Sequence, residues 1–195
     1  MIRVAAVGDL HVGADEQDPL EPWLAGLADE ADALLLAGDL TRCGAPAEAE
    51  RLAAALAHVP VPTVAVLGNH DYHSAREAEI TELLRNVGVC VLEGNSVVLQ
   101  TGTGRLGIAG TKGFGGGFLG ACGSEFGEPE MKAFIHHTRS IATRLRADLA
   151  ELEADIRVAL LHYSPVPDTL AGERREIYPF LGSYLLADAI EMNST

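Results

Sequence analysis

Four short, uninterrupted apolar segments stand out along the chain. They are Ile2–Val7, Ala33–Ala37, Thr63–Leu67 and Arg157–Leu161. Apolar residues that continue without alternation are typical of strands buried on both faces of a sheet. Between the first three segments, apolar positions recur at helical spacing over Pro19–Glu30 and Ala47–His58. This alternation of strand and helix predicts parallel strands joined by helical crossovers.

A third helix is expected to begin near Ser74-Ala-Arg-Glu77, which has the form of a capping box. Beyond Val87 the apolar segments are shorter and are separated by glycine and asparagine. We expect antiparallel strands at Val89–Leu92, Val97–Gln100 and Leu106–Ala109. Gly102–Gly107 has the spacing of a dinucleotide-binding turn. The chain continues there as a strand and opens no helix, so a tight hairpin is the better interpretation.

A glycine-rich stretch follows, with eleven of the 21 glycines lying between Gly102 and Gly127. Long loops often carry function, and we expect residues 110–130 to form a mobile lid or a substrate-facing insert. Amphipathic spacing predicts a long helix over Pro129–Ala154, and a further helix is expected over Tyr178–Ile190. No linker or internal repeat divides the chain, so residues 1–195 are predicted to form a single domain.

Charge and composition narrow the class of protein. The sequence has 28 Asp and Glu against 14 Lys and Arg, a formal net charge of −14, and 48% apolar residues. The apolar content excludes a disordered chain, and the acidity disfavours binding to long nucleic acid. There is no membrane-spanning apolar run, no signal-peptide core and no Cys-x-x-Cys pair among the three cysteines. We therefore expect a cytoplasmic protein that does not engage a membrane.

Polar residues follow each apolar segment at the point where the predicted strand ends. The motifs are G-D-L-H at 8–11, G-D at 38–39, G-N-H-D at 68–71 and H-Y-S-P at 162–165. Because ligands bind beyond the carboxyl ends of strands in open α/β sheets, these residues are expected to converge. Two aspartates, an asparagine carbonyl and two histidines suit Mn²⁺, Fe or Zn²⁺ better than Ca²⁺. These donors exceed what one tetrahedral site needs, which favours two ions that share a carboxylate.

The order of these four motifs resembles the calcineurin-like metallophosphoesterases, from Val4 to about Ser164. The resemblance implies an α/β fold in which a β-sandwich of two mixed sheets is flanked by helices, with two divalent metal ions at its edge. The metal ligands that it implies are Asp9 and His11 on the first ion, Asp39 on both ions, and Asn69 and His162 on the second.

Catalytic roles also follow from the resemblance. His70 matches a histidine that is not a ligand but lies over the substrate phosphate and helps the leaving oxygen to take a proton. Asp71 is expected to orient and charge-support that imidazole. The implied reaction is hydrolysis of a phosphomonoester or phosphodiester by a water that two ions activate. A small phosphorylated substrate, with a nucleotide as one candidate, suits the acidic chain. Lys112, Arg174 and Arg175 are candidate cations for the phosphate.

One part of the family pattern has no counterpart here. The pattern closes with Gly-His-x-His after a further strand, adding one ligand to each ion, whereas no histidine follows His162 in this sequence. We therefore expect the domain to be incomplete at its C-terminus or another group to complete the site. Two alternatives to the enzyme stay open: a non-catalytic form that acts as a binding module, and a nucleotide-binding protein without metals. The oligomeric state is not predicted.

Overall fold

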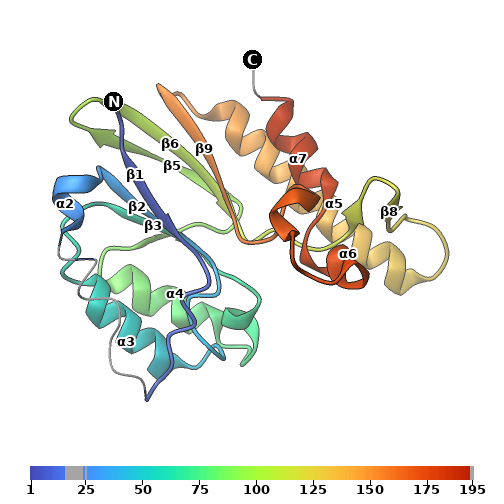
Figure 1. Cartoon of the computed structure of the whole chain (residues 1–195), viewed down its shortest axis with the longest axis horizontal. Coiled ribbons are helices and arrows are strands. Elements are labelled where there is room, and N and C mark those ends of the chain that lie inside the picture. Colours follow the sequence, from blue (N-terminus) through green and yellow to red (C-terminus); the bar gives the residue numbers. More distant parts are fainter. Residues whose placement is uncertain (16–23, 25, 194–195) are drawn as a thin grey trace.

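Two β-sheets lie face to face, and helices cover their outer sides, in a computed structural model that describes residues 1–15, 24 and 26–193 (Figure 1). The alternating direction of side chains along β2 (Ala33–Ala37) shows how the layers form. Leu34 and Leu36 pack with the helices, whereas Ala33 and Leu35 pack against the second sheet. All four are buried, which explains the continuous apolar segment and confirms the predicted α-β-β-α arrangement.

The first sheet is entirely parallel within the described residues. Its strands, in spatial order, are β1 (Val4–Val7), β2, β3 (Thr63–Val66) and β4 (Cys90–Val91). The connecting helices are α2 (Leu27–Glu30), α3 (Pro46–Leu56) and α4 (Glu77–Asn86). The predicted crossovers are thereby confirmed, although the predicted helix Pro19–Glu30 lies largely outside the described residues.

Two local predictions in this region are wrong. The segment Val89–Leu92 forms β4, which pairs in parallel with β3, because α4 carries the chain back before the strand begins. This sheet is therefore parallel and not mixed. Helix α4 begins at Glu77 without a side-chain cap. The Ser74 hydroxyl donates a hydrogen bond to the Cys43 carbonyl oxygen, so it joins two loops and does not cap the helix.

The second sheet is mixed, as predicted. Strand β5 (Asn95–Thr101) pairs antiparallel with β6 (Gly104–Thr111), and β6 pairs in parallel with β9 (Ile156–Leu161). The tight hairpin between β5 and β6 confirms the interpretation of the glycine spacing there. The fourth apolar segment therefore lies in a different sheet from the first three.

Helices α5 (Pro129–Glu151) and α7 (Tyr184–Glu191) cover this second sheet. The helix expected over Tyr178–Ile190 is interrupted, since α6 (Tyr178–Leu181) ends before Gly182 and the Ser183 hydroxyl caps α7. None of the helices in the described ranges is long and apolar enough to cross a membrane.

The glycine-rich stretch contains a small antiparallel ribbon, β7 (Gly117–Phe118) and β8 (Ala121–Cys122). Its glycines allow close backbone contact with the region of α6. A Cβ atom at Gly115 would lie 2.6 Å from the Pro179 carbonyl oxygen, and the Gly116 amide donates to that same oxygen. These contacts account for Gly115 and Gly116 by packing, whereas the lid function of residues 110–130 remains a prediction.

Candidate metal centre

The loops after β1 and β2 hold three polar residues in a strained backbone conformation. Asp9, His11 and Asp39 have φ angles of 55°, 47° and 48°, in the left-handed region that costs an L-residue about 1–2 kcal/mol. Hydrogen bonds between the loops hold this geometry: the Asp9 amide donates to the Gly38 carbonyl, and the His11 amide to that of Asp39. Strained backbone of this kind clusters at functional sites. No sequence pattern signalled it.

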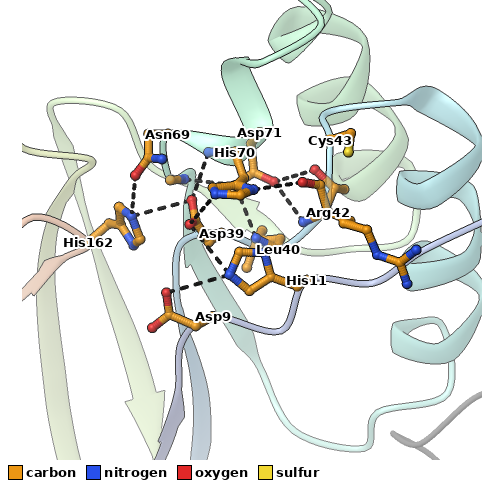
Figure 2. Close-up of polar contacts among 12 residues, drawn as sticks. Asp9, His11, Asp39, Leu40, Arg42, Cys43, Asn69, His70, Asp71 and His162 are labelled. Carbon is orange, nitrogen blue, oxygen red and sulfur yellow. Dashed lines mark hydrogen bonds and ion pairs between the residues drawn. The ribbon is translucent and has the colours of Figure 1, made fainter.

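Asp39 lies at the centre of the cluster, with only 6% of its side chain exposed (Figure 2). Its Oδ1 accepts a hydrogen bond from the His70 amide at 2.9 Å and lies 3.3 Å from Nε2 of His162. Its Oδ2 lies 3.7 Å from Nε2 of His11 and 3.9 Å from Nε2 of His70. The two carboxylate oxygens therefore face different histidines on opposite sides.

Candidate ligand atoms form two groups that share Asp39. His11, Asp39 and His70 make one group, and Asp9, Asp39 and His162 make the other, with the atoms of each group within 4.8 Å of one another. All of the side chains predicted as ligands are thus brought together, since Oδ1 of Asn69 is also 3.0 Å from Nε2 of His162. The predicted pairing of Asp9 with His11 is compatible with the distances as well, because Oδ1 of Asp9 lies 4.0 Å from Nε2 of His11.

The surroundings of His162 fit a bound cation. Its Nδ1 lies 3.0 Å from the Ala37 carbonyl oxygen, so we assign the ring proton to Nδ1. The lone pair on Nε2 then points at Oδ1 of Asn69 and Oδ1 of Asp39. A cation placed between acceptors that face one another in this way would be stabilised by all of them. Nitrogen and oxygen donors together suit a transition-metal ion.

His70 is oriented by the backbone and not by Asp71, so the predicted role of Asp71 is wrong. Nδ1 of His70 lies 2.7 Å from the Arg42 carbonyl oxygen. The fully buried Asp71 carboxylate accepts hydrogen bonds from the amides of Leu40 and Gly68 and from the amide and hydroxyl of Thr41. The two residues are neighbours in the 3₁₀ turn η1 (His70–Tyr72), where successive side chains point in different directions. Asp71 instead ties the loop after β2 to the loop after β3.

Two glycines before the polar residues allow the close approach of these loops. A Cβ atom at Gly38 would lie 2.6 Å from the Cβ and Cγ atoms of His162, and one at Gly68 would collide with the Asp39 carboxylate. Gly38 also has a φ of +86°. The sequence marked these positions as sharp turns, whereas the structure adds that any side chain would displace a candidate ligand.

A cavity of about 760 Å³ adjoins the cluster and extends between the two sheets. At one end it is lined by candidate ligands, and at the other by apolar side chains from β2, β9 and α7, including Leu35, Val158, Leu160 and Ile190. β1 and β9 are the outermost strands of their sheets at this opening. A polar end beside an apolar wall is typical of small-molecule sites.

Lys112 and Tyr163 border the cluster, and both titrate away from their usual ranges. Burial lowers the pKa of the Lys112 ammonium, while the nearby carboxylates of Glu93 and Asp39 oppose that shift. Burial and the charge of Asp39 raise the pKa of the Tyr163 hydroxyl. Lys112 was one of three cations that the sequence suggested for phosphate. The other two cations are exposed: Arg174 precedes the turn η3 (Arg175–Ile177), and Arg175 is the first residue of that turn.

Comparison with known proteins agrees with this geometry. Residues 2–191 match the family described as calcineurin-like phosphoesterase. No curated protein sequence matches the chain. Among solved structures, phosphopantetheinyl hydrolase from Mycobacterium tuberculosis superposes with a TM-score of 0.67 at 18% identity, over 95% of this chain and 77% of that protein. TT1561 of Thermus thermophilus superposes with a TM-score of 0.57 at 19% identity, over 99% of this chain and 78% of that protein. At such identities the structural likeness shows a common fold, and the match over residues 2–191 shows that the chain belongs to the calcineurin-like phosphoesterase family.

Proposed function

We propose that this chain hydrolyses a small phosphorylated substrate, a phosphomonoester or phosphodiester, with two divalent metal ions held on either side of Asp39. Membership of the family supports a metal-dependent phosphoesterase. The observation that carries the two-metal proposal is the Asp39 carboxylate, whose two oxygens face different histidines. A carboxylate with one oxygen toward each group of donors is suited to bridging two ions.

The residues that would hold the ions are Asp9, His11, Asp39, Asn69 and His162. Manganese, iron and zinc all suit this mixture of nitrogen and oxygen donors. When bound, such ions supply positive charge for the phosphate oxygens and lower the pKa of a water molecule that can attack phosphorus.

His70 has the position of a proton donor in this proposal. The Arg42 carbonyl oxygen holds Nδ1, which leaves Nε2 directed into the cluster beside Asp39. Because Nδ1 donates to that carbonyl, Nε2 can give a proton to the oxygen that leaves phosphorus only when both ring nitrogens are protonated, as a general acid does. Asp71 contributes indirectly, because its hydrogen bonds fix the loops that carry Asp39 and His70.

The proposed substrate is small because the chain carries a net charge of −14, which disfavours long polyanions. The cavity of about 760 Å³ beside the candidate ligands has room for a molecule of that size. Nucleotides and phosphopantetheinyl groups are two substrate classes to assay, the second because a protein of similar fold is a phosphopantetheinyl hydrolase.

The test compares wild-type protein with Asp39→Asn, using Asp188→Asn on the exposed face of α7 as the matched control. Each protein is incubated with Mn²⁺, its bound metals are counted, and turnover of an aryl phosphate and its diester is measured. We expect two ions per wild-type chain and, for Asp39→Asn, loss of metal with turnover at least about 100-fold slower, because even indirect changes at metal sites cost 10–100-fold.

Full activity of Asp39→Asn would refute the bridging role. A wild-type protein that binds metal but turns over none of the esters would instead favour the non-catalytic binding module. His70→Ala separates the two kinds of residue further, because loss of a proton donor should slow turnover while bound metal stays close to the wild-type level.

A further inference from the structure

Lys112 lies directly beside the candidate ligand His162. It follows β6, and the amides of His162 and Tyr163 donate hydrogen bonds to its carbonyl oxygen at 3.2 and 2.9 Å. Strands β6 and β9 are parallel neighbours, so their carboxyl ends reach the metal centre together (Figure 1). The backbone of Lys112 is thereby fixed relative to the cluster.

Three aromatic rings surround the Lys112 ammonium. Its Nζ lies 4.9 Å from the ring centre of Tyr72, 5.1 Å from that of Phe114 and 5.2 Å from that of Tyr163. Tyr72 is two residues beyond His70, and Tyr163 follows His162, so two of the rings come from loops of the metal centre. The face of an aromatic ring attracts a cation at such distances because its π-electrons carry a partial negative charge. The rings therefore hold a positive charge at the border of the site.

The hydrogen-bonding capacity of this ammonium is largely unused. An ammonium has three donors, but within the described part of the chain Lys112 makes one long hydrogen bond, 3.5 Å to the Gly113 carbonyl, and no ion pair. The chain has only one other lysine, the exposed Lys132 on α5. A half-buried cation with free donors is suited to binding an anionic oxygen.

We propose that Lys112 binds a terminal phosphate oxygen of the substrate and makes the enzyme favour phosphomonoesters over phosphodiesters. This inference rests on the proposed function. A monoester has three non-bridging oxygens and up to two negative charges, so two metal ions and one ammonium can each engage a different oxygen. In a diester one of these oxygens carries a second organic group and the total charge is lower. The aromatic rings act by holding the ammonium at that point.

The test compares Lys112→Met, Lys112→Arg and the control Lys132→Met with wild type, each loaded with Mn²⁺. For Lys112→Met we expect kcat/KM for an aryl phosphate to fall about 10- to 100-fold, as the loss of a charge-assisted hydrogen bond implies. For the diester, kcat/KM should fall by a several-fold smaller factor, so that the ratio of kcat/KM for the monoester to kcat/KM for the diester decreases. Lys112→Arg should restore part of the ratio, and Lys132→Met should match wild type.

An unchanged monoester-to-diester ratio would overturn the proposal. If kcat/KM fell equally for both esters, Lys112 would only support the packing of the rings, and if neither value fell, Lys112 would not contact the substrate. Binding of inorganic phosphate to the Mn²⁺-loaded protein, followed by calorimetry, is a readout independent of turnover and should weaken in Lys112→Met by a similar factor. If wild type hydrolyses neither ester, the proposed function fails, and phosphate binding alone decides the role of Lys112. If Lys112→Met does not fold, Lys112→Gln takes its place in each comparison.

Discussion

The parallel sheet β1–β4 and the mixed sheet β5-β6-β9 lie face to face, but they contribute to the candidate metal centre in different ways. The parallel sheet supplies Asp9, His11, Asp39, Asn69 and His70 from three neighbouring loops. Backbone hydrogen bonds between these loops hold the side chains near one another. Among the described residues the mixed sheet supplies one candidate ligand, His162, whose Nδ1 lies 3.0 Å from the Ala37 carbonyl oxygen of the parallel sheet.

This difference divides the site into a local half and a half that depends on tertiary packing. The group His11, Asp39 and His70 belongs entirely to the parallel sheet. The group Asp9, Asp39 and His162 requires the two sheets to be docked correctly. Disturbing the packing between the sheets should therefore affect the second group first, which makes the comparison testable.

The largest expected effect on metal content and turnover comes from two single variants, each of which removes a histidine from one half of the site. His11→Ala and His162→Ala should each lose about one bound ion and slow turnover by about 100-fold or more. Loss of a direct ligand should weaken metal binding more than a change in the residues around the ligands, which itself costs about 10–100-fold. Counting bound Mn²⁺ by mass spectrometry next to the turnover assay checks this. If either variant lost both ions, the two halves would not be separable and the comparison would fail.

A smaller effect is expected from Gly38→Ala, which alters the contact between the sheets without replacing a candidate ligand. The new Cβ would lie 2.6 Å from the His162 side chain, in a backbone with a φ of +86°. We expect a loss of about 1–2 kcal/mol in the free energy of unfolding from the backbone conformation, and weaker metal binding from the displaced histidine.

Gly88→Ala is the matched control, because its φ is +90° and nothing lies within 4 Å of the added atom. Chemical unfolding and metal titration of both variants isolate the effect on His162. If Gly88→Ala weakened metal binding as much as Gly38→Ala, the contact at His162 would not be the cause.

The smallest effect is expected at the opposite end of the parallel sheet. The Arg3 amide donates to the Asp32 carboxylate at 2.8 Å and, with the Arg3 charge, holds the pKa of Asp32 below its usual range. A carboxyl with a lowered pKa stabilises the fold above its unfolded pKa, and this contribution is lost as pH falls through the folded pKa. Asp32→Asn should therefore be slightly less stable than wild type at pH 7, with unchanged metal binding.

Denaturant unfolding at pH 7 and at successively lower pH checks the sign of this effect. The difference between wild type and Asp32→Asn should shrink as pH falls below about 4, where the carboxyl takes up its proton. A difference that grew on acidification would contradict the assigned interaction. Loss of metal in this variant would show that the far end of the sheet is coupled to the site.

Much of the parallel sheet could be predicted from the sequence because its information is local. Strands buried on both faces appear as continuous apolar segments, and the helices between them have apolar residues at regular spacing. The polar residues after Ala33–Ala37 and Thr63–Leu67 then fall at the carboxyl ends, where a parallel sheet gathers them. The direction of β4 was missed because a two-residue strand carries no pattern of its own.

The detailed site was less predictable, since its contacts join residues far apart in the chain. The amino-acid sequence alone identifies Asp9, His11, Asp39, Asn69, His70 and His162 as candidates, because their residue types and strand-end positions can be read locally. Only the folded chain reveals that a backbone carbonyl from Arg42 orients His70, that Asp71 joins two loops, and that three rings hold Lys112 beside His162. The first two relations depend on how the loops after β2 and β3 fold against each other, and the third depends on how the two sheets pack. Contacts between segments that are distant in the chain leave no periodic trace in a sequence.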